Sequence, residues 1–221
     1  VKELIELTRY GMVINLDRCI GCRACSVGCA VSRGLPAGDR WSGVKEYVTG
    51  TFPNLEVTYL PTLCMQCENP SCLEVCPTGA TTKGDDGVVT VDAATCIGCG
   101  MCDTACPYGA RSIVSKVESN HGADGPTAHE EHHFVTHVAN TAEKCTFCAD
   151  RRERGEEVLC VKTCVADART FGDLDDASSD VAKALAAAGS KAQVLLESAG
   201  TSPSVYYLYS GKNKLDDAFG A

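Results

Sequence analysis

Residues 96–107 read CIGCGMCDTACP, so three cysteines stand three positions apart and a fourth follows four positions later. Residues 19–29, CIGCRACSVGC, repeat this spacing. Three such cysteines can wrap a loop around one 4Fe–4S cluster, while the fourth, about one helical turn further on, ligates a neighbouring cluster. Gly21, Gly98 and Gly100 let backbone N–H groups approach the cluster sulfurs closely. The pattern therefore predicts 4Fe–4S clusters held in pairs.

Two further runs contain the remaining cysteines. Residues 64–77 read CMQCENPSCLEVCP, and residues 145–164 read CTFCADRRERGEEVLCVKTC. Four runs of four account for all 16 cysteines of the chain and predict four 4Fe–4S clusters. The candidate iron ligands are Cys19, Cys22, Cys25, Cys29, Cys64, Cys67, Cys72, Cys76, Cys96, Cys99, Cys102, Cys106, Cys145, Cys148, Cys160 and Cys164.

A disulfide scaffold and a zinc site are the alternative explanations for so many cysteines, and both explain their spacing less well than 4Fe–4S clusters do. Disulfide scaffolds are typical of short secreted chains, whereas this chain has 221 residues and many of its cysteines stand three positions apart, which makes them poor disulfide partners for one another. Structural zinc uses two C-x2-C pairs separated by a gap, a pattern that the fourth run alone could satisfy. The first and third runs cannot, because each offers three thiolates within one short loop.

Composition and charge narrow the possible partners. The formal net charge is −9, and bound clusters add negative charge, so nucleic acid and anionic membrane surfaces are disfavoured. Aromatic residues make up only 6% of the chain, so the apolar core is thin and we expect the clusters to complete it. No run reaches the roughly 18 apolar residues of a membrane span, and the first residues lack the apolar region of a signal peptide.

The residues after each run suggest how the runs pair. The second and third runs end in Cys-Pro, whereas Ala30 and Val165 follow the first and fourth. The short segment between the second and third runs predicts a hairpin, with strands near Ala80–Thr82 and Val88–Val91. This favours an inner and an outer pair of runs but leaves sequential pairing open.

With their flanks, the four runs resemble a known family from about Tyr10 to Asp176. It is the four-cluster iron–sulfur (beta) subunit of molybdopterin oxidoreductases of the dimethyl sulfoxide reductase superfamily, which includes polysulfide, thiosulfate, tetrathionate and arsenate reductases and aromatic-ring dehydroxylases. One departure is Val165, where that family often has proline.

The resemblance implies nested pairing. Cluster one would use Cys19, Cys22, Cys25 and Cys164; cluster two, Cys29, Cys145, Cys148 and Cys160; cluster three, Cys64, Cys67, Cys72 and Cys106; cluster four, Cys76, Cys96, Cys99 and Cys102. It also implies that cluster one faces the molybdenum subunit and that cluster four lies at the far end of the relay.

The expected fold class is α+β, with two ferredoxin-like two-cluster modules, loop insertions and a C-terminal helix–strand extension. The expected boundaries are 10–33 with 141–172 for the outer module, 55–116 for the inner module, 34–54 and 117–140 for the insertions, and 173–221 for the extension.

Several elements outside the runs can be predicted locally. Residues 11–16 read as a strand, and residues 31–60 as a loop-rich connection in which Trp41 anchors a small core. A helix is expected over Asp180–Ala188, capped by Ser178 or Ser179 and ended by Gly189. Strands are expected at 193–197 and 204–210, where Tyr206, Tyr207 and Tyr209 serve packing.

Residues 129–133 read HEEHH and formally match the H-E-x-x-H motif of zinc proteases. Thr127 and Glu130 also fit a capping box that could start a helix. The flanks are loop-like and no third ligand is evident, so we expect a solvated loop.

The sequence contains no nucleophile–base pair and no phosphate or dinucleotide loop, so no substrate chemistry is expected in this chain. The favoured function is electron relay to or from a large molybdopterin-containing catalytic subunit, with a membrane anchor subunit or a soluble electron donor as a further possible partner. The alternatives are a free-standing polyferredoxin and a hydrogenase-associated electron carrier. The expected location is the cytoplasm, or an extracytoplasmic compartment if a partner with a twin-arginine signal carries the chain across the membrane.

Overall fold

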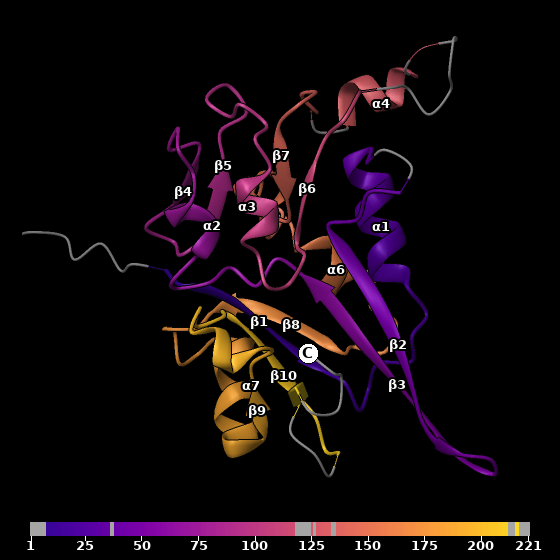
Figure 1. The fold of residues 1–221 in the computed structure, drawn as a ribbon. Coiled ribbons are helices and arrows are strands. Elements are labelled where there is room, and N and C mark those ends of the chain that lie inside the picture. The colour runs from indigo at the N-terminus through magenta and orange to yellow at the C-terminus, as the bar shows by residue number, and fades with distance from the viewer. Residues whose placement is uncertain are drawn as a thin grey trace, which may run out of the picture.

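The computed structural model describes residues 8–35, 38–117, 125, 127–133, 136–211 and 215–216. Helices and strands are mixed along the chain, which confirms the α+β class. Figure 1 shows a four-stranded sheet with helix α7 in the lower half, and short helices with two-stranded hairpins above it. In this described part of the chain, no helix combines the length and the apolar character needed to cross a membrane.

The four-stranded sheet joins segments from both ends of the chain. Its order is β8 (Arg169–Asp173), β1 (Tyr10–Asn15), β10 (Val205–Leu208) and β9 (Ala192–Gln193). Strand β1 runs parallel to β10 and antiparallel to β8. Residues 12–14 of β1 are all buried, because the main core covers one face and α7 packs on the other. The predicted strand at 11–16 is therefore confirmed as the centre of this sheet.

Helix α7 (Asp180–Ala188) matches its prediction. The Ser179 hydroxyl accepts a hydrogen bond of 3.1 Å from the backbone N–H of Ala182, so Ser179 is the N-cap. Gly189, with a φ of 52°, ends the helix. Val181 is fully buried and fixes the helix on the sheet.

The predicted strand at 193–197 is wrong beyond its first residue. β9 ends at Gln193, and the chain turns through Leu196, which has a φ of 53°. The Asp216 carboxylate accepts hydrogen bonds from the backbone N–H groups of Leu196 and Glu197, at 2.6 and 3.2 Å, and holds this turn. The second strand is confirmed as β10, in which Tyr207 is fully buried and donates to the Pro61 carbonyl at 2.9 Å.

The upper half contains the cysteine runs. Its elements are α1 (Ala24–Arg33), α2 (Ser71–Glu74), β4 (Thr81–Lys83), β5 (Val89–Val91), α3 (Met101–Thr104), β6 (Arg111–Ile113), β7 (Ala142–Lys144), α5 (Ala149–Glu153) and α6 (Leu159–Lys162). The β4–β5 pair confirms the predicted hairpin. Helix α1 packs against α6, and α2 packs against α3. The first run thus contacts the fourth, and the second contacts the third.

The loop-rich connection expected at 31–60 is wrong. Helix α1 extends to Arg33, and β2 (Ser42–Thr51) pairs with β3 (Asn54–Leu63) in a long antiparallel hairpin. Figure 1 shows its tip projecting away from the rest of the molecule. Residues near the tip are exposed on both faces, so the alternation that signals a strand is missing from the sequence there.

The histidine-rich segment contains a helix rather than the expected loop. Helix α4 covers Ala128–His133, and the predicted capping box is present. Glu130 accepts from the Thr127 backbone N–H at 2.7 Å, and the Thr127 hydroxyl accepts from the Glu130 N–H at 3.3 Å. His121 and the side chains of His129, His132 and His133 lie outside the described residues.

His137, the last histidine, connects this segment to the first run. Its ring is bonded through Nδ1 to Glu143 at 2.8 Å and through Nε2 to the Arg33 carbonyl at 2.8 Å. The Trp41 ring meets it edge-on, with centroids 6.4 Å apart, and packs against the main core. The packing role expected for Trp41 is thus confirmed, but it packs against the main core rather than a small separate one.

Candidate iron–sulfur centre

The loops that carry the runs are shaped by residues with positive φ. Gly21 and Gly98 have φ values of 70° and 65°. A Cβ at Gly21 would lie 2.4 Å from the Tyr59 ring, and one at Gly98 would lie 2.2 Å from the Asn140 carbonyl oxygen. Glycine is therefore required at both positions by backbone conformation and by close packing of a neighbouring segment.

The first set of thiols comprises the first three cysteines of the first run, Cys19, Cys22 and Cys25, and the last cysteine of the fourth run, Cys164. Burial raises the pKa of Cys19, and the nearby Cys25 and Cys164 thiolates raise it further. Cys25 is buried where α1 begins, and Cys22 is exposed three residues before it. Cys164, far away in the sequence, is thereby brought beside the first run.

The second set is the most deeply buried. Burial raises the pKa of Cys29 to about 12, and the charges of Cys148 and Cys160 add to this. The pKa of Cys145 is also raised well above its ordinary value, first by burial and then by Cys29, Cys160 and Cys148. The last cysteine of the first run therefore lies among the cysteines of the fourth.

The third set comprises the first three cysteines of the second run, Cys64, Cys67 and Cys72, and the last cysteine of the third run, Cys106. Burial raises the pKa of Cys67 to about 12, and Cys64, Cys72 and Cys106 contribute to the increase. Without a metal, burial therefore favours the neutral thiol at Cys19, Cys29, Cys145 and Cys67. Iron ligation requires thiolates, so cluster binding here releases protons.

The fourth set surrounds a cavity. Its lining includes Cys76, Cys96, Cys99 and Cys102, contributed by the second and third runs. Burial raises the pKa of Cys76, but hydrogen bonds from Thr81 and Thr78 outweigh this and lower it to about 7. All four cysteines thus border the same cavity.

The charge of the interior suits a bound anionic group. The buried charged residues in the described part of the chain are all basic: Arg33, Arg111, Lys144 and Arg169. A 4Fe–4S cluster with four thiolates carries net negative charge and offers sulfide acceptors. The Nη2 atom of Arg33 and the Nε atom of Arg111 are buried donors without an acceptor among the described residues. The thiols and the cations together therefore fit 4Fe–4S clusters.

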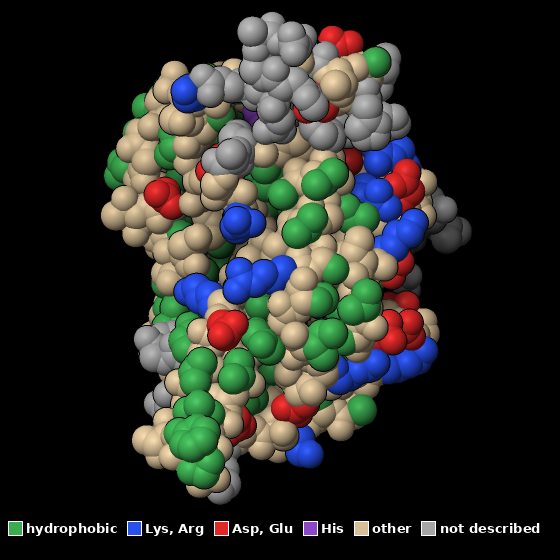
Figure 2. Space-filling view, turned by 90° about the vertical axis from the view of Figure 1, so that its right-hand side faces the viewer, with side chains coloured by type: hydrophobic (Ala, Val, Ile, Leu, Met, Phe, Trp, Pro, Cys, Tyr) green, Lys and Arg blue, Asp and Glu red, His purple; other side chains and the backbone are tan. Residues whose placement is uncertain are grey.

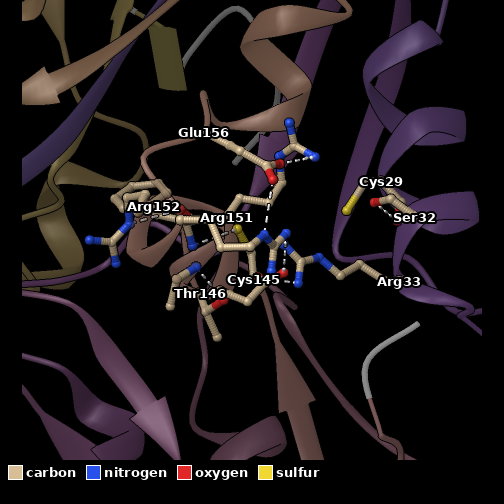
Figure 3. Close-up of polar contacts among 12 residues, drawn as sticks. Cys29, Ser32, Arg33, Cys145, Thr146, Arg151, Arg152 and Glu156 are labelled. Atoms are coloured by element: carbon tan, nitrogen blue, oxygen red, sulfur yellow. Dashed lines mark hydrogen bonds and ion pairs between the residues drawn. The ribbon is translucent and has the colours of Figure 1, made fainter. Parts of the chain in front are cut away.

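Arg33 illustrates this arrangement in the second set. Figure 3 shows its guanidinium extending from α1, past Cys29, toward the segment that contains Cys145 and Arg151. There it is ion-paired with Asp150 and lies near Cys148. The side chain thus connects the first and fourth runs beside their shared thiols.

A zinc site would draw several ligands onto a single ion. Among the residues that the structure describes, no group of three or more His, Cys, Asp or Glu side chains is placed to hold one metal ion.

Sequence reasoning missed Arg111, Lys144 and Arg169. A signal was present, because Arg111 follows Cys106 by five positions and Arg169 follows Cys164 by the same interval. The two arginines are the first residues of strands β6 and β8, the first strands that follow the last cysteines of their runs.

Comparison with known proteins agrees with the 4Fe–4S clusters that the thiols and the buried cations indicate. The family described as "4Fe-4S dicluster domain" matches residues 55–122 and 130–174. The B subunit of the tetrathionate reductase of Salmonella typhimurium is 40% identical over 96% of this chain and 74% of its own length. The arsenate respiratory reductase iron–sulfur subunit of a Shewanella species is 36% identical over 91% of this chain and 97% of its own length. The B component of the polysulfide reductase of Wolinella succinogenes is 36% identical, with coverage of 90% and 93%.

Proposed function

Since this protein belongs to the iron–sulfur B subunits of the dimethyl sulfoxide reductase superfamily, we propose that it holds four 4Fe–4S clusters in nested pairs and relays electrons for a molybdopterin catalytic subunit. The proposed ligands of clusters one to four are the four sets of cysteines described above. Bound clusters supply one-electron redox chemistry, and the chain sets their spacing, charge and exposure to solvent.

The main support for four clusters is the grouping of the thiols. Each group mixes cysteines from two runs, and in each case the runs are those whose helices contact each other. Nested pairing accounts for this mixing, because the last cysteine of one run then completes the cluster of the other. We accordingly propose two ferredoxin-like modules, one from the outer runs and one from the inner runs.

Exposure indicates where electrons enter and leave. Among the 16 cysteines, Cys22 and Cys99 are the exposed ones. Cys22 belongs to the first set and Cys99 to the fourth, so the two ends of the proposed relay reach the surface, while no cysteine of the second or third set is exposed. Ile20 and Ile97 occupy equivalent positions beside them and are 61% and 64% exposed.

The surface beside the first set is suited to a protein partner. A groove there is lined by Arg23, Arg40, Lys45 and Trp41 together with apolar side chains. Figure 2 shows the face that carries α1 and the β2–β3 hairpin, with Lys and Arg side chains gathered across its middle among hydrophobic ones. We propose that this face docks the catalytic subunit, and that the Cys99 end exchanges electrons with a membrane anchor subunit or a soluble donor.

Iron and sulfide analysis tests the number of clusters. Anaerobically purified protein is expected to contain sixteen iron atoms and sixteen acid-labile sulfides per chain, because each of four clusters needs four of each. Zinc should be nearly absent. A fully loaded preparation with half that iron, or with one zinc per chain, would show that the assignment is wrong.

The equivalent residues Ile20 and Ile97 provide a matched test of the docking face. Ile20→Glu is expected to weaken association with the molybdenum subunit roughly 30-fold, since a charge at an apolar contact costs about 2 kcal/mol. Ile97→Glu should leave this affinity unchanged and slow electron exchange with an external donor. Both variants should retain the iron of the unmodified chain. A loss of affinity in Ile97→Glu alone would place the catalytic subunit at the opposite end.

A further inference from the structure

Three buried cations lie where the four sets of thiols adjoin. They are Arg169, Lys144 and Arg111, with 4%, 2% and 6% of their surfaces exposed. Arg33, the other buried cation, has a carboxylate partner in Asp150. None of the three has such a partner among the described residues.

Arg169 adjoins the first and second sets. Its Nη2 atom is 3.4 Å from the Cys25 sulfur and 3.4 Å from the Ser42 hydroxyl oxygen. Cys160 also lies near this guanidinium. Cys25 belongs to the first set and Cys160 to the second, so one planar cation is bonded to a ligand of one proposed cluster and lies near a ligand of the next.

Arg111 repeats this arrangement in the inner module. Its Nη2 atom is 3.0 Å from the Cys72 sulfur, and its Nη1 atom donates to the Thr81 hydroxyl at 3.1 Å. Cys102 also lies near the guanidinium. Cys72 belongs to the third set and Cys102 to the fourth.

Lys144 lies between the two modules. Its Nζ atom donates to the carbonyls of Cys145, at 3.0 Å, and Val89, and lies 3.5 Å from Gln66 Oε1. Three acceptors match the three N–H bonds of an ammonium group. Gln66, which lies between Cys64 and Cys67, also donates to the Cys145 carbonyl at 2.8 Å. The network therefore joins the second set to the third, a step that no cysteine run spans.

We propose that Arg169, Lys144 and Arg111 are junction residues, one at each step between consecutive clusters, and that each raises the reduction potential of both clusters it adjoins. This inference rests on the cluster assignment of the proposed function. Reduction adds negative charge in a buried region of low dielectric constant, where a nearby cation stabilises the added charge strongly. Hydrogen bonds to ligand sulfur act in the same direction. One cation between two clusters also offsets their mutual repulsion.

Two glutamine variants, Arg169→Gln and Arg111→Gln, test the proposal, and each serves as the control for the other. In the anaerobically purified full chain, Arg169→Gln is expected to lower the midpoint potentials of clusters one and two. The expected change is at least tenfold in the reduction equilibrium, which is about 59 mV for one electron. Clusters three and four should keep their potentials. Arg111→Gln should produce the reverse pattern. Redox titration followed by electron paramagnetic resonance measures all four.

The potentials and the iron content of these variants distinguish the proposed redox role of the arginine from a purely structural role. If Arg169→Gln retains its iron and all four potentials are unchanged, or if only one cluster shifts, the junction role is wrong. If Arg169→Gln fails to load clusters one and two, Arg169→Lys becomes the test. Its shorter cation should shift both potentials downward by a smaller amount, and unchanged potentials there overturn the proposal. An unmodified chain with fewer than four clusters would instead refute the proposed function.

Discussion

Removal of iron by a chelator under anaerobic conditions is expected to abolish cooperative folding of the whole chain. The main core includes five of the proposed ligands, Cys25, Cys64, Cys145, Cys148 and Cys160, and aromatic residues are too few to replace the clusters. Without iron, the thiols of Cys29 and Cys67 are neutral at neutral pH, because burial raises their pKa values to about 12. Loss of metal is thus loss of folding free energy.

The buried cations determine how much folding free energy is lost when iron is removed. Arg111, Lys144 and Arg169 then lie in the interior beside neutral thiols, and each unpaired buried charge costs about 3–5 kcal/mol. Two such charges together already cost about as much as the 5–15 kcal/mol by which a typical domain is stable. Circular dichroism melting of the chelated protein should show no sharp transition, and iron with sulfide should restore it. A native-like spectrum with a sharp transition after chelation would contradict this expectation.

Cys164→Ser is expected to alter the cluster held by Cys19, Cys22 and Cys25 and to leave the two inner clusters intact. The reason is spatial, since Cys164 lies beside Cys19 in the folded chain. Electron paramagnetic resonance should show one changed signal of four, and iron should fall by at most about four atoms.

Cys106→Ser is the matched control, because Cys106 ends the third run as Cys164 ends the fourth. It should change the cluster of Cys64, Cys67 and Cys72, beside which it lies. Sequential pairing makes a different prediction for Cys164→Ser, namely a change in the cluster of Cys96, Cys99 and Cys102. That result would reject nested pairing and keep the four-cluster assignment.

The features that could be predicted correctly depend on neighbouring residues. Helix α7 follows from a serine cap, a run of alanines and a terminal glycine. The β4–β5 hairpin follows from two short strands around a Gly-Asp-Asp-Gly turn. Helix α4 is the exception, because its capping box is evident in the sequence while its loop-like flanks favour a solvated loop.

The errors at the other elements have a common cause in distant contacts. The turn at Leu196 is held by the Asp216 carboxylate, twenty positions away, which no local pattern reveals. The β2–β3 hairpin is stabilised by pairing along its whole length, from Ser42 with Leu63 to Thr51 with Asn54. Much of it is exposed, so its sequence lacks the alternation from which strands are recognised.

By itself, the sequence determined the chemistry of this protein: 16 cysteines in runs whose spacing suits 4Fe–4S clusters. Spacing within a run is local, so a few backbone turns are enough to bring its thiols around one centre. Only the tertiary structure decided which runs meet, because β1, β8 and β10 and the packing of α1 on α6 bring distant segments together. It also decided the positions of Arg111, Lys144 and Arg169, since a buried cation is stable only where folding gathers negative charge around it.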